Sequence, residues 1–528
     1  MTDTCLNIIT QLTVELHKDD ISKEKLGTGV LYTNRKLSGV VYVLTAKHCL
    51  LKLGEKGRVS LRIYNPGTST YEYVTPVKQS ILLHSEDDAG IIIINKRELA
   101  SVVSDLPSVY VVDKNFGTEE AVSKGFPLAT LDQTNENGES SLAMIRMTYL
   151  HEDTTENVFQ LSTNDDYSED TIVGMSGSGI FIEACEELYI NGIFIRYTDE
   201  ERGKVISAQR LISFNKLLEE EYKKKMSLSF LGHHGLGHKT LKNNVEDSVA
   251  NLGPRYCQKV NVKTGTAKYF DCVAKTPAYF ERLYRNIDSW LTEKSYRTRK
   301  NSIRIGELES HLKAIRDDFI VALSDLDQHV DAVVDFSSLM KRIEDLRKEL
   351  GEVRHRFYSD YSSTKKDDNV RKELEADEAR LSEISQDLYS FTENFEDLKI
   401  NLANNPYLII KGEAGCGKSH LLGDVASKRI DDGLPTLLFL GTDFSEGTYE
   451  TTITSKVGFV GTFREFLSSF NQIGTQVGSR ALLMIDALNE GPQAVLWKDR
   501  LSGLIKSLKD YPAIGLVVSV RDTYFDDV

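Results

Sequence analysis

One octapeptide restricts the fold of this chain more than any other segment. Residues 412–419 read GEAGCGKS and match the pattern GxxxxGK[ST] at every required position. The octapeptide follows a run of strand-forming residues at 407–411 and precedes a segment expected to be helical. Further apolar runs of strand length alternate with helical segments at 436–440, 481–485 and 515–520. This alternation predicts an α/β fold with a parallel sheet over residues 401–528.

The residue types around this octapeptide are those that bind a nucleoside triphosphate. Glycine amides can surround the phosphates, and Lys418 supplies positive charge to the outer ones. The hydroxyl of Ser419 and the carboxylate of Asp486 are the expected Mg²⁺ ligands. Glu490 is a candidate to position water and Arg521 a candidate to sense the nucleotide, so we expect ATP and Mg²⁺ as cofactors. The candidate nucleotide-binding residues are Gly412, Gly415, Gly417, Lys418, Ser419, Asp486, Glu490 and Arg521.

A second set of chemically active residues is spread over three N-terminal segments. The segments VYVLTAKHCL, EDDAGIIII and GMSGSGIF supply His48, an aspartate and Ser176 in that order. A serine hydroxyl becomes a nucleophile when an imidazole removes its proton and a carboxylate holds the imidazole in place. Gly174 permits a tight turn, so the amides of Gly174 and Ser176 can point together as an oxyanion hole. The three segments therefore predict nucleophilic serine catalysis.

The acid of this set has two candidates, Asp87 and Asp88, which are adjacent. Each has a small residue two positions further on. We favour Asp88, because it places only one charged group, not two, ahead of the apolar strand at 90–94. Asp87 remains the alternative.

Residues 1–225 contain many short runs of Val, Ile, Tyr and Thr separated by turn-forming residues, which predicts a barrel or sandwich. Within them, LTAKHC at 44–49, GTG at 27–29 and GMSGSG at 174–179 resemble three motifs of the trypsin-like serine proteases. The resemblance implies two six-stranded β-barrels, with His48, Asp88 and Ser176 in the cleft between them.

Two further positions acquire meaning from the same resemblance. Asp170 lies six residues before Ser176, where the family has the base of its primary specificity pocket. A carboxylate there favours Lys or Arg before the scissile bond, although a solvated loop acid is the alternative. Met175 replaces the acidic residue that pairs with a cleaved N-terminus in secreted members. The resemblance therefore implies that a different event activates this protease.

The C-terminal part resembles a second family. GEAGCGKSH, IDALNE and VSVRDTY are similar to motifs of the STAND class of P-loop NTPases, most closely to bacterial antiviral members, which are similar to NOD-like immune receptors. NLGPRY at 251–256 resembles the connector that these proteins carry ahead of a helical region. Asn489 stands where many relatives have an acid, which makes slow hydrolysis the expectation.

That family continues into a helical lid and a repeat array that recognises a phage protein. The present sequence stops at Val528, so we expect the NTPase domain to be incomplete and the sensor to be absent. The resemblance also implies that the active form is a homo-oligomer.

Two regions lie between the motif-bearing parts. We interpret 226–275 as a connector, and its GHHGLGHK segment at 232–239 as flexible, because it lacks an acidic or cysteine partner at metal-ligand spacing. Residues 276–400 are charged and helical. Apolar stripes at steps of three and four run from Ile305 to Val333, from Leu339 to Leu350 and from Leu381 to Leu398. Helices that pack together are favoured over one extended coiled coil, with a loop at 362–369.

Composition agrees with a folded multidomain protein. The chain has 528 residues, of which 40% are apolar and 27% charged, and 64 basic against 79 acidic residues give a net charge of −15. This balance argues against nucleic acid as a partner. No apolar run reaches the roughly 18–20 residues that span a bilayer, and the N-terminus does not read as a secretion signal. Six scattered cysteines favour reduced thiols and a cytoplasmic location.

The combined prediction is an antiphage effector and switch. A serine endopeptidase would be activated by ATP-dependent oligomerisation after a phage protein is sensed, and would cleave a protein substrate. The alternatives are an ATP-dependent quality-control protease and a scaffold with a non-catalytic protease fold. The expected domains are a protease at 1–225, a connector at 226–275, a helical region at 276–400 and the N-terminal part of an NTPase at 401–528.

Overall fold

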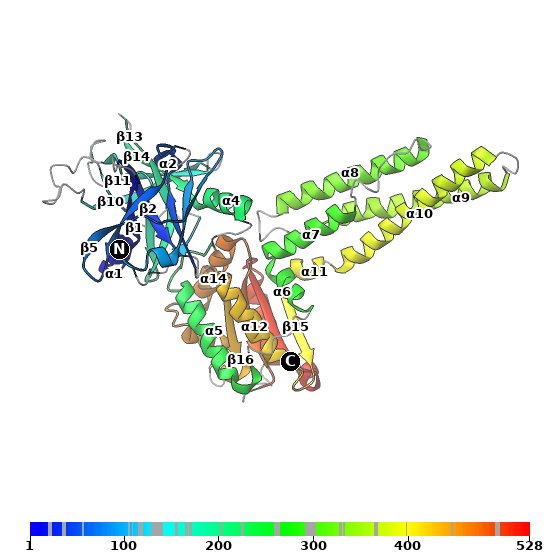
Figure 1. Cartoon of the computed structure of the whole chain (residues 1–528). Coiled ribbons are helices and arrows are strands. Elements are labelled where there is room, and N and C mark those ends of the chain that lie inside the picture. The colour runs from blue at the N-terminus through cyan, green and yellow to red at the C-terminus, as the bar shows by residue number, and fades with distance from the viewer. Residues whose placement is uncertain are drawn as a thin grey trace. The chain divides into compact units, whose positions relative to one another are not determined.

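The structure is a computed structural model of the chain, and it divides into two compact units, Met1–Thr240 and Leu241–Val528 (Figure 1). The units are described separately. The division lies within the expected connector. The structure describes all residues except 20–23, 34–38, 55–56, 104–105, 108, 114–119, 128–140, 154–156, 164–166, 168–171, 201–202, 223–225, 227, 258–264, 291–302, 327–329, 331–332, 364–367, 398, 445–446, 491–496 and 528.

The first half of the N-terminal unit is an antiparallel sheet. Its seven strands lie in the order β5-β4-β1-β2-β3-β7-β6, and no pairing joins the end strands β5 and β6 among the residues described. The expectation of a six-stranded barrel here is therefore wrong in strand number. The elements are α1 (Asp3–Leu12), β1 (Thr13–Lys18), β2 (Lys25–Tyr32), β3 (Val40–Thr45), α2 (Lys47–Leu51), β4 (Val59–Asn65), β5 (Thr70–Val74), β6 (Gln79–Leu83) and β7 (Gly90–Asn95).

The second half of this unit is a closed six-stranded β-barrel, as the resemblance implied. Its strands run β12-β9-β10-β11-β14-β13, the additional β12–β13 pairing closes the ring, and β8 pairs in parallel with β13. The elements are β8 (Tyr110–Val111), β9 (Glu120–Gly125), β10 (Ala143–Asp153), β11 (Val158–Thr163), β12 (Gly179–Ala184), β13 (Glu187–Glu200), β14 (Gly203–Arg210) and α4 (Leu211–Tyr222).

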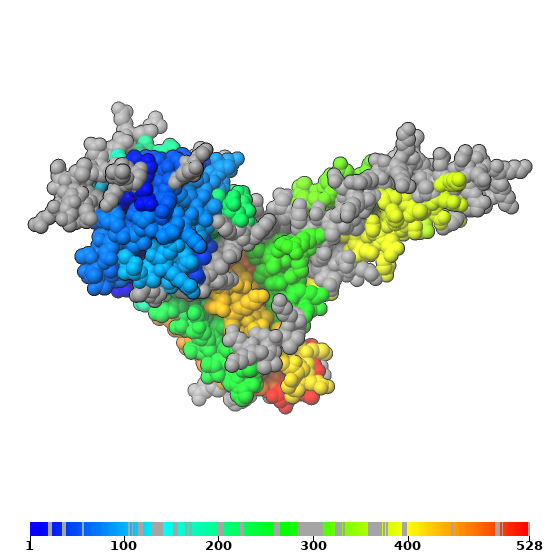
Figure 2. All heavy atoms as spheres, in the orientation of Figure 1, coloured from blue at the N-terminus to red at the C-terminus, as the bar shows by residue number. Residues whose placement is uncertain are grey.

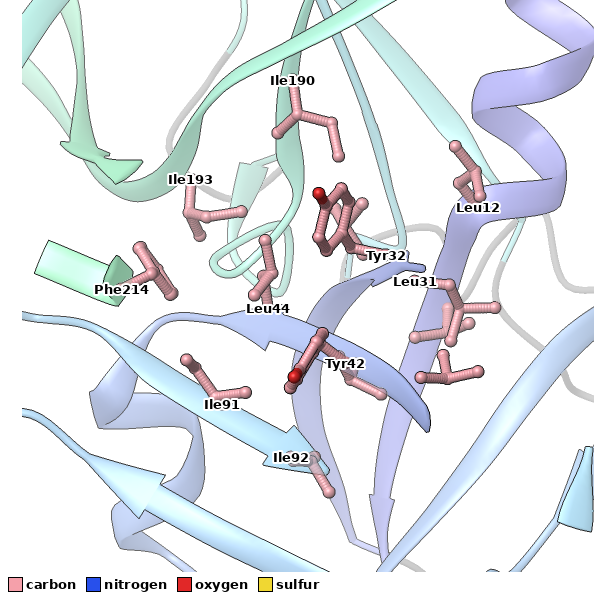
Figure 3. Packing of buried hydrophobic residues seen from close by; sticks show 14 of the residues in the cluster. Leu12, Leu31, Tyr32, Tyr42, Leu44, Ile91, Ile92, Ile190, Ile193 and Phe214 are labelled. Atoms are coloured by element: carbon pink, nitrogen blue, oxygen red, sulfur yellow. The ribbon is translucent and has the colours of Figure 1, made fainter. Parts of the chain in front are cut away.

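One hydrophobic core joins the two halves of the N-terminal unit. Ile190 and Ile193 of β13 and Phe214 of α4 pack in the same cluster as Leu44 of β3 and Ile91 of β7 (Figure 3). These side chains are at most 3% exposed. In Figure 2, where all heavy atoms are drawn as spheres, the N-terminal residues of this unit are coloured blue. The segments that carry His48 and Ser176 are therefore supported by a shared core.

The histidine-rich segment packs against the barrel, which differs from the flexible connector that we expected. Leu236 and His238 are buried, and the buried Glu187 accepts hydrogen bonds from the backbone N–H groups of His238 (2.9 Å) and Lys239 (2.6 Å). This carboxylate thereby caps the first turn of α5 (His238–Leu252). Within the described residues no group of three or more His, Cys, Asp or Glu side chains could hold a metal ion.

The helices of the second unit include three long ones that pack side by side (Figure 1). Apolar stripes from α8, α9 and α10 meet in one core, with Phe319, Ile343 and Leu388 at its centre. The first stripe is shorter than we expected, because α8 ends at Leu326 and Val333 is 69% exposed. The helices are α6 (Ala267–Ala274), α7 (Pro277–Trp290), α8 (Ile303–Leu326), α9 (Ser337–Ser363), α10 (Asp368–Asp397) and α11 (Ile400–Asn404).

The rest of the second unit is built on a four-stranded parallel sheet in the order β15-β18-β17-β16. Strands β16, β17 and β18 are buried almost throughout, as expected of a parallel sheet covered by helices. The elements are β15 (Tyr407–Gly412), α12 (Lys418–Asp431), β16 (Thr436–Leu440), α13 (Tyr449–Lys456), α14 (Phe463–Val477), β17 (Ala481–Asp486), α15 (Trp497–Leu508) and β18 (Ile514–Arg521).

Arg480, immediately before β17, joins this sheet to the helices. It is 3% exposed, and its guanidinium donates to the carbonyls of Val273 (3.0 Å), Ala403 (2.6 Å) and Pro512 (2.7 Å). These carbonyls belong to α6, to α11 and to the loop before β18. A buried charge is tolerated here because hydrogen bonds surround it.

No helix in the described part of the chain is both long and apolar enough to cross a membrane.

Replacing Arg480 should destabilise the second unit specifically. Arg480→Met leaves three buried carbonyls without their donor, so we expect the free energy of unfolding to fall by about 3 kcal/mol or more. Both tryptophans of the chain, Trp290 and Trp497, lie in this unit, so their fluorescence during urea unfolding reports on it. Arg356→Met on the exposed face of α9 is the control and should change stability by less than about 0.5 kcal/mol. Equal effects of the two variants would contradict this role for Arg480.

Candidate functional sites

The first candidate site contains His48, which lies on the short helix α2 directly after β3. The backbone N–H of His48 donates to Asp88 Oδ1 (3.0 Å), and His48 Nδ1 lies 2.7 Å from Asp88 Oδ2. Asp88 itself immediately precedes the buried end of β7. The neighbouring Asp87 points elsewhere and accepts from Asn157 Nδ2 (3.1 Å). Of the two candidate acids, Asp88 is thus the one bound to the imidazole.

Protonation of this pair is set by the hydrogen bond between its members. The bond to Asp88 raises the pKa of His48 from 6.5 to about 10. Burial alone would raise the pKa of Asp88, but its hydrogen bonds with His48 outweigh burial, and the pKa is lowered. At neutral pH the resting pair is therefore an imidazolium bound to a carboxylate.

The loop around Ser176 is held against the first sheet by Thr28 of β2. The N–H of Thr28 donates to the Ser176 carbonyl (2.9 Å), and its hydroxyl donates to the Gly174 carbonyl (3.0 Å). Cys49 Sγ, next to His48, also donates to the Ser176 carbonyl (3.4 Å). These contacts bring the serine loop and the histidine helix to one place.

The backbone of this loop requires glycine at two positions. Gly174 and Gly177 have φ of 101° and 91°, where other residues are strained. A Cβ on Gly177 would lie 2.0 Å from the Thr28 carbonyl oxygen. Within the described residues, the Gly174 and Ser176 amides have no protein acceptor.

Two other residues from the sequence analysis can be placed or excluded. Met175 is fully buried in the core of the second barrel and packs near Gly125. An apolar side chain fits there because the site offers hydrophobic contacts. Asp170, the predicted base of a specificity pocket, lies outside the described residues. None of the six cysteines, all of which belong to the described part of the chain, is in a disulfide.

The second candidate site lies at the carboxyl end of the parallel sheet. Between β15 and α12 the chain turns through Gly415 and Gly417, whose φ values are 77° and 92°. Lys418 Nζ donates to the carbonyls of Gly412 (2.7 Å) and Glu413 (2.8 Å). A cavity of about 290 Å³ opens here. Its lining includes Gly415, Gly417, Lys418, Ser419, Asp486, Glu490 and Arg521, together with Arg255 and Ser519.

Asp486 carries a free oxygen into this region. Its Oδ1 accepts from the Ser519 hydroxyl (2.6 Å), whereas its buried Oδ2 has no hydrogen-bond partner within the described residues. A buried carboxylate oxygen is costly without a partner, and oxygen is the ligand that Mg²⁺ prefers. With the Ser419 hydroxyl lining the same cavity, these residues fit a magnesium ion bound with phosphates.

Glu490 lies between two arginines. Its Oε2 is 2.8 Å from Arg255 Nη1 and its Oε1 is 3.0 Å from Arg521 Nη2. Asn489 Oδ1 accepts a hydrogen bond from the backbone N–H of Arg521 (3.0 Å). The Asn489 side chain therefore helps to hold the backbone of Arg521 in place. Arg255 was not among the predicted site residues, although it belongs to the NLGPRY segment whose resemblance could have drawn attention to it.

Comparisons with known proteins were made for the whole chain. No family model matches it, and no curated protein matches it significantly. Among solved structures, one described as the crystal structure of a thermostable serine protease AL20 from an extremophilic microorganism matches with 11% sequence identity and a TM-score of 0.30. The match covers 41% of this chain and 100% of that chain.

Proposed function

We propose that the N-terminal unit is a serine endopeptidase. The observation that carries this proposal is the joint placement of the Asp88–His48 pair and the Ser176 loop, which Cys49 and Thr28 hold together. In this mechanism neutral His48 removes the proton of the Ser176 hydroxyl as that oxygen attacks a peptide carbonyl. Asp88 fixes the imidazole and stabilises its protonated form. The Gly174 and Ser176 amides donate to the oxyanion.

The same proposal gives the enzyme an alkaline working range. His48 acts as a base only after it has lost its proton, and the bond to Asp88 raises the pKa at which this loss occurs. The proposal also includes a preference for Lys or Arg before the scissile bond, because Asp170 would pair with that basic side chain.

We further propose that the C-terminal unit binds ATP with Mg²⁺. Ser419 and Asp486 would hold the ion, while Lys418 and the glycine amides hold the phosphates. Mg²⁺–ATP, when bound, supplies a triphosphate whose charge the protein can sense. Arg255 and Arg521 both form ion pairs with Glu490. Because both arginines also line the cavity, the phosphate charge would attract them. Glu490 would then be released to orient water.

Joined in one chain, the two activities favour a cytoplasmic, ATP-controlled protease that serves as an antiphage effector. Nucleotide binding would drive homo-oligomerisation, and assembly would activate cleavage of a protein substrate. The resemblance to antiviral STAND proteins supports a phage protein as the trigger. The alternatives are an ATP-dependent quality-control protease and a scaffold with a non-catalytic protease fold.

The protease proposal predicts labelling of Ser176 by a fluorophosphonate probe. The labelling rate should rise with pH, with a midpoint above the ordinary histidine value of 6.5, because Asp88 holds the proton on His48. Asp88→Asn removes this effect, so its midpoint should fall towards 6.5 while the maximal rate drops by about 10³- to 10⁴-fold. Ser176→Ala should not be labelled. Unchanged labelling in Ser176→Ala would show that the probe reacts elsewhere.

The nucleotide proposal predicts Mg²⁺-dependent binding of a fluorescent ATP analogue. Lys418→Ala removes the charge that pairs with the phosphates and should weaken binding by about 10- to 100-fold. Lys509→Ala removes a lysine that does not line the cavity and serves as the control. Binding is measured by fluorescence anisotropy. Equal affinity of the two variants for the ATP analogue would contradict the proposal that this cavity binds ATP.

Coupling between the units predicts that nucleotide changes both mass and labelling. With a non-hydrolysable ATP analogue and Mg²⁺, sedimentation should detect an oligomer, and probe labelling of Ser176 should accelerate by about tenfold or more. Lys418→Ala should lose both responses. Ser176→Ala should still assemble, which separates assembly from catalysis. Labelling that is indifferent to nucleotide in the wild type and in Lys418→Ala would contradict the switch.

A further inference from the structure

Asp88 is held from a second direction by a side chain of the other half of the N-terminal unit. Gln209 Oε1 accepts a hydrogen bond from the Asp88 backbone N–H (3.1 Å). Gln209 is only 1% exposed and lies on β14, the last strand of the barrel, where its backbone pairs with Ile193. The contact spans 121 residues of sequence and joins the barrel to the turn before β7.

The glutamine amide is itself fixed in orientation. Its Nε2 donates to the Asn157 carbonyl (2.8 Å) and to the Ser213 hydroxyl (2.9 Å). With two acceptors on the nitrogen side, the oxygen must face Asp88. Ser213 is buried in the first turn of α4, so the orientation of Gln209 depends on where that helix begins.

The same barrel edge also fixes the residue beside Asp88. Asn157, at the left-handed φ of 51°, donates from Nδ2 to Asp87 Oδ2 (3.1 Å). His84 Nε2 lies 3.7 Å from that oxygen. The carboxylate of Asp87 is thus hydrogen-bonded to Asn157, and the backbone N–H of Asp88 is hydrogen-bonded to Gln209. The carboxylate of Asp88 is left to face His48.

We propose that Gln209 is a positioning residue that sets the carboxylate of Asp88 against His48 and makes this geometry depend on the start of α4. The proposal rests on the proposed protease function. Every polar group on Asp88 has an assigned partner: the N–H has Gln209, the carbonyl has the Lys47 N–H (3.4 Å), and the carboxylate has His48. Removing the Gln209 contact leaves the backbone N–H of Asp88 without its acceptor and loosens the residue that carries the carboxylate.

Gln209→Met tests the proposal, because methionine keeps the volume but can neither accept from Asp88 nor donate to Ser213. We expect probe labelling of Ser176 to slow by about tenfold or more, as displacement of a catalytic group commonly does. We also expect the titration midpoint of His48 to fall. Ser213→Ala is the graded comparison: it removes one of the two acceptors of the Gln209 amide and keeps the Asn157 acceptor, so its midpoint should fall by less than that of Gln209→Met.

The titration is best followed by NMR of ¹⁵N-labelled histidine, assigned with His48→Ala, because this readout does not require activity. The other charged or titratable groups around the pair, Asp87, His84, Lys47 and Cys49, are the same in both variants. A Gln209→Met protein whose His48 midpoint equals that of the wild type would overturn the proposal, even if labelling changed. A wild-type protein that never labels would instead overturn the protease function and leave the titration result standing.

Should Gln209→Met fail to fold, as judged by circular dichroism, Gln209→Ala provides the same comparison without placing an apolar group on the Asp88 N–H. Its His48 midpoint should also fall. Gln209→Glu keeps an oxygen acceptor at the same position and should label faster than either variant. Equal labelling by the Glu and Ala variants would contradict a role for the acceptor oxygen.

Discussion

The candidate site of the N-terminal unit depends on one fully buried threonine. Thr28 uses its N–H on the Ser176 carbonyl and its hydroxyl on the Gly174 carbonyl, and that hydroxyl also accepts from the Phe126 N–H (3.1 Å). Its own carbonyl accepts from the Thr45 hydroxyl (2.7 Å), three residues before His48. Since Thr28 belongs to the first sheet and the serine loop to the second, these bonds fix the relative position of nucleophile and base.

The local sequence pattern predicted most of the strands and helices, but it did not predict the number of strands in the first sheet or the end of α8. The parallel strands at 407–411, 436–440, 481–485 and 515–520 were predicted close to where they occur, because buried strands give uninterrupted apolar runs. The number of strands in the first sheet was not predicted correctly. Edge strands such as β5 contain polar as well as apolar residues, so their sequences are similar to those of loops. The stripe ending at Val333 failed because periodicity cannot show where a helix stops.

Choice between chemically identical neighbours needs contacts that are distant in sequence. Asp87 and Asp88 have the same side chain and nearly the same local sequence, so the local pattern favours Asp88 but does not exclude Asp87. The structure separates them through Asn157 and Gln209, which are 70 and 121 residues away. Arg255 is a similar case, because its partner Glu490 lies 235 residues further along the chain. The contacts of such residues can be recognised only in the folded structure, where residues distant in sequence lie close together.

The two candidate sites share an electrostatic property that neither motif reveals. In each, a side chain with a proposed role is held in an ion pair: His48 lies beside Asp88, and Glu490 lies between Arg255 and Arg521. Because the bond to Asp88 raises the pKa of His48, the imidazole must lose its proton before it can act as a base. A change in charge relieves the second pair directly, since phosphates compete for the arginines. The first pair would be relieved by a rise in pH or by a movement of Asp88, whose backbone N–H is bound by Gln209.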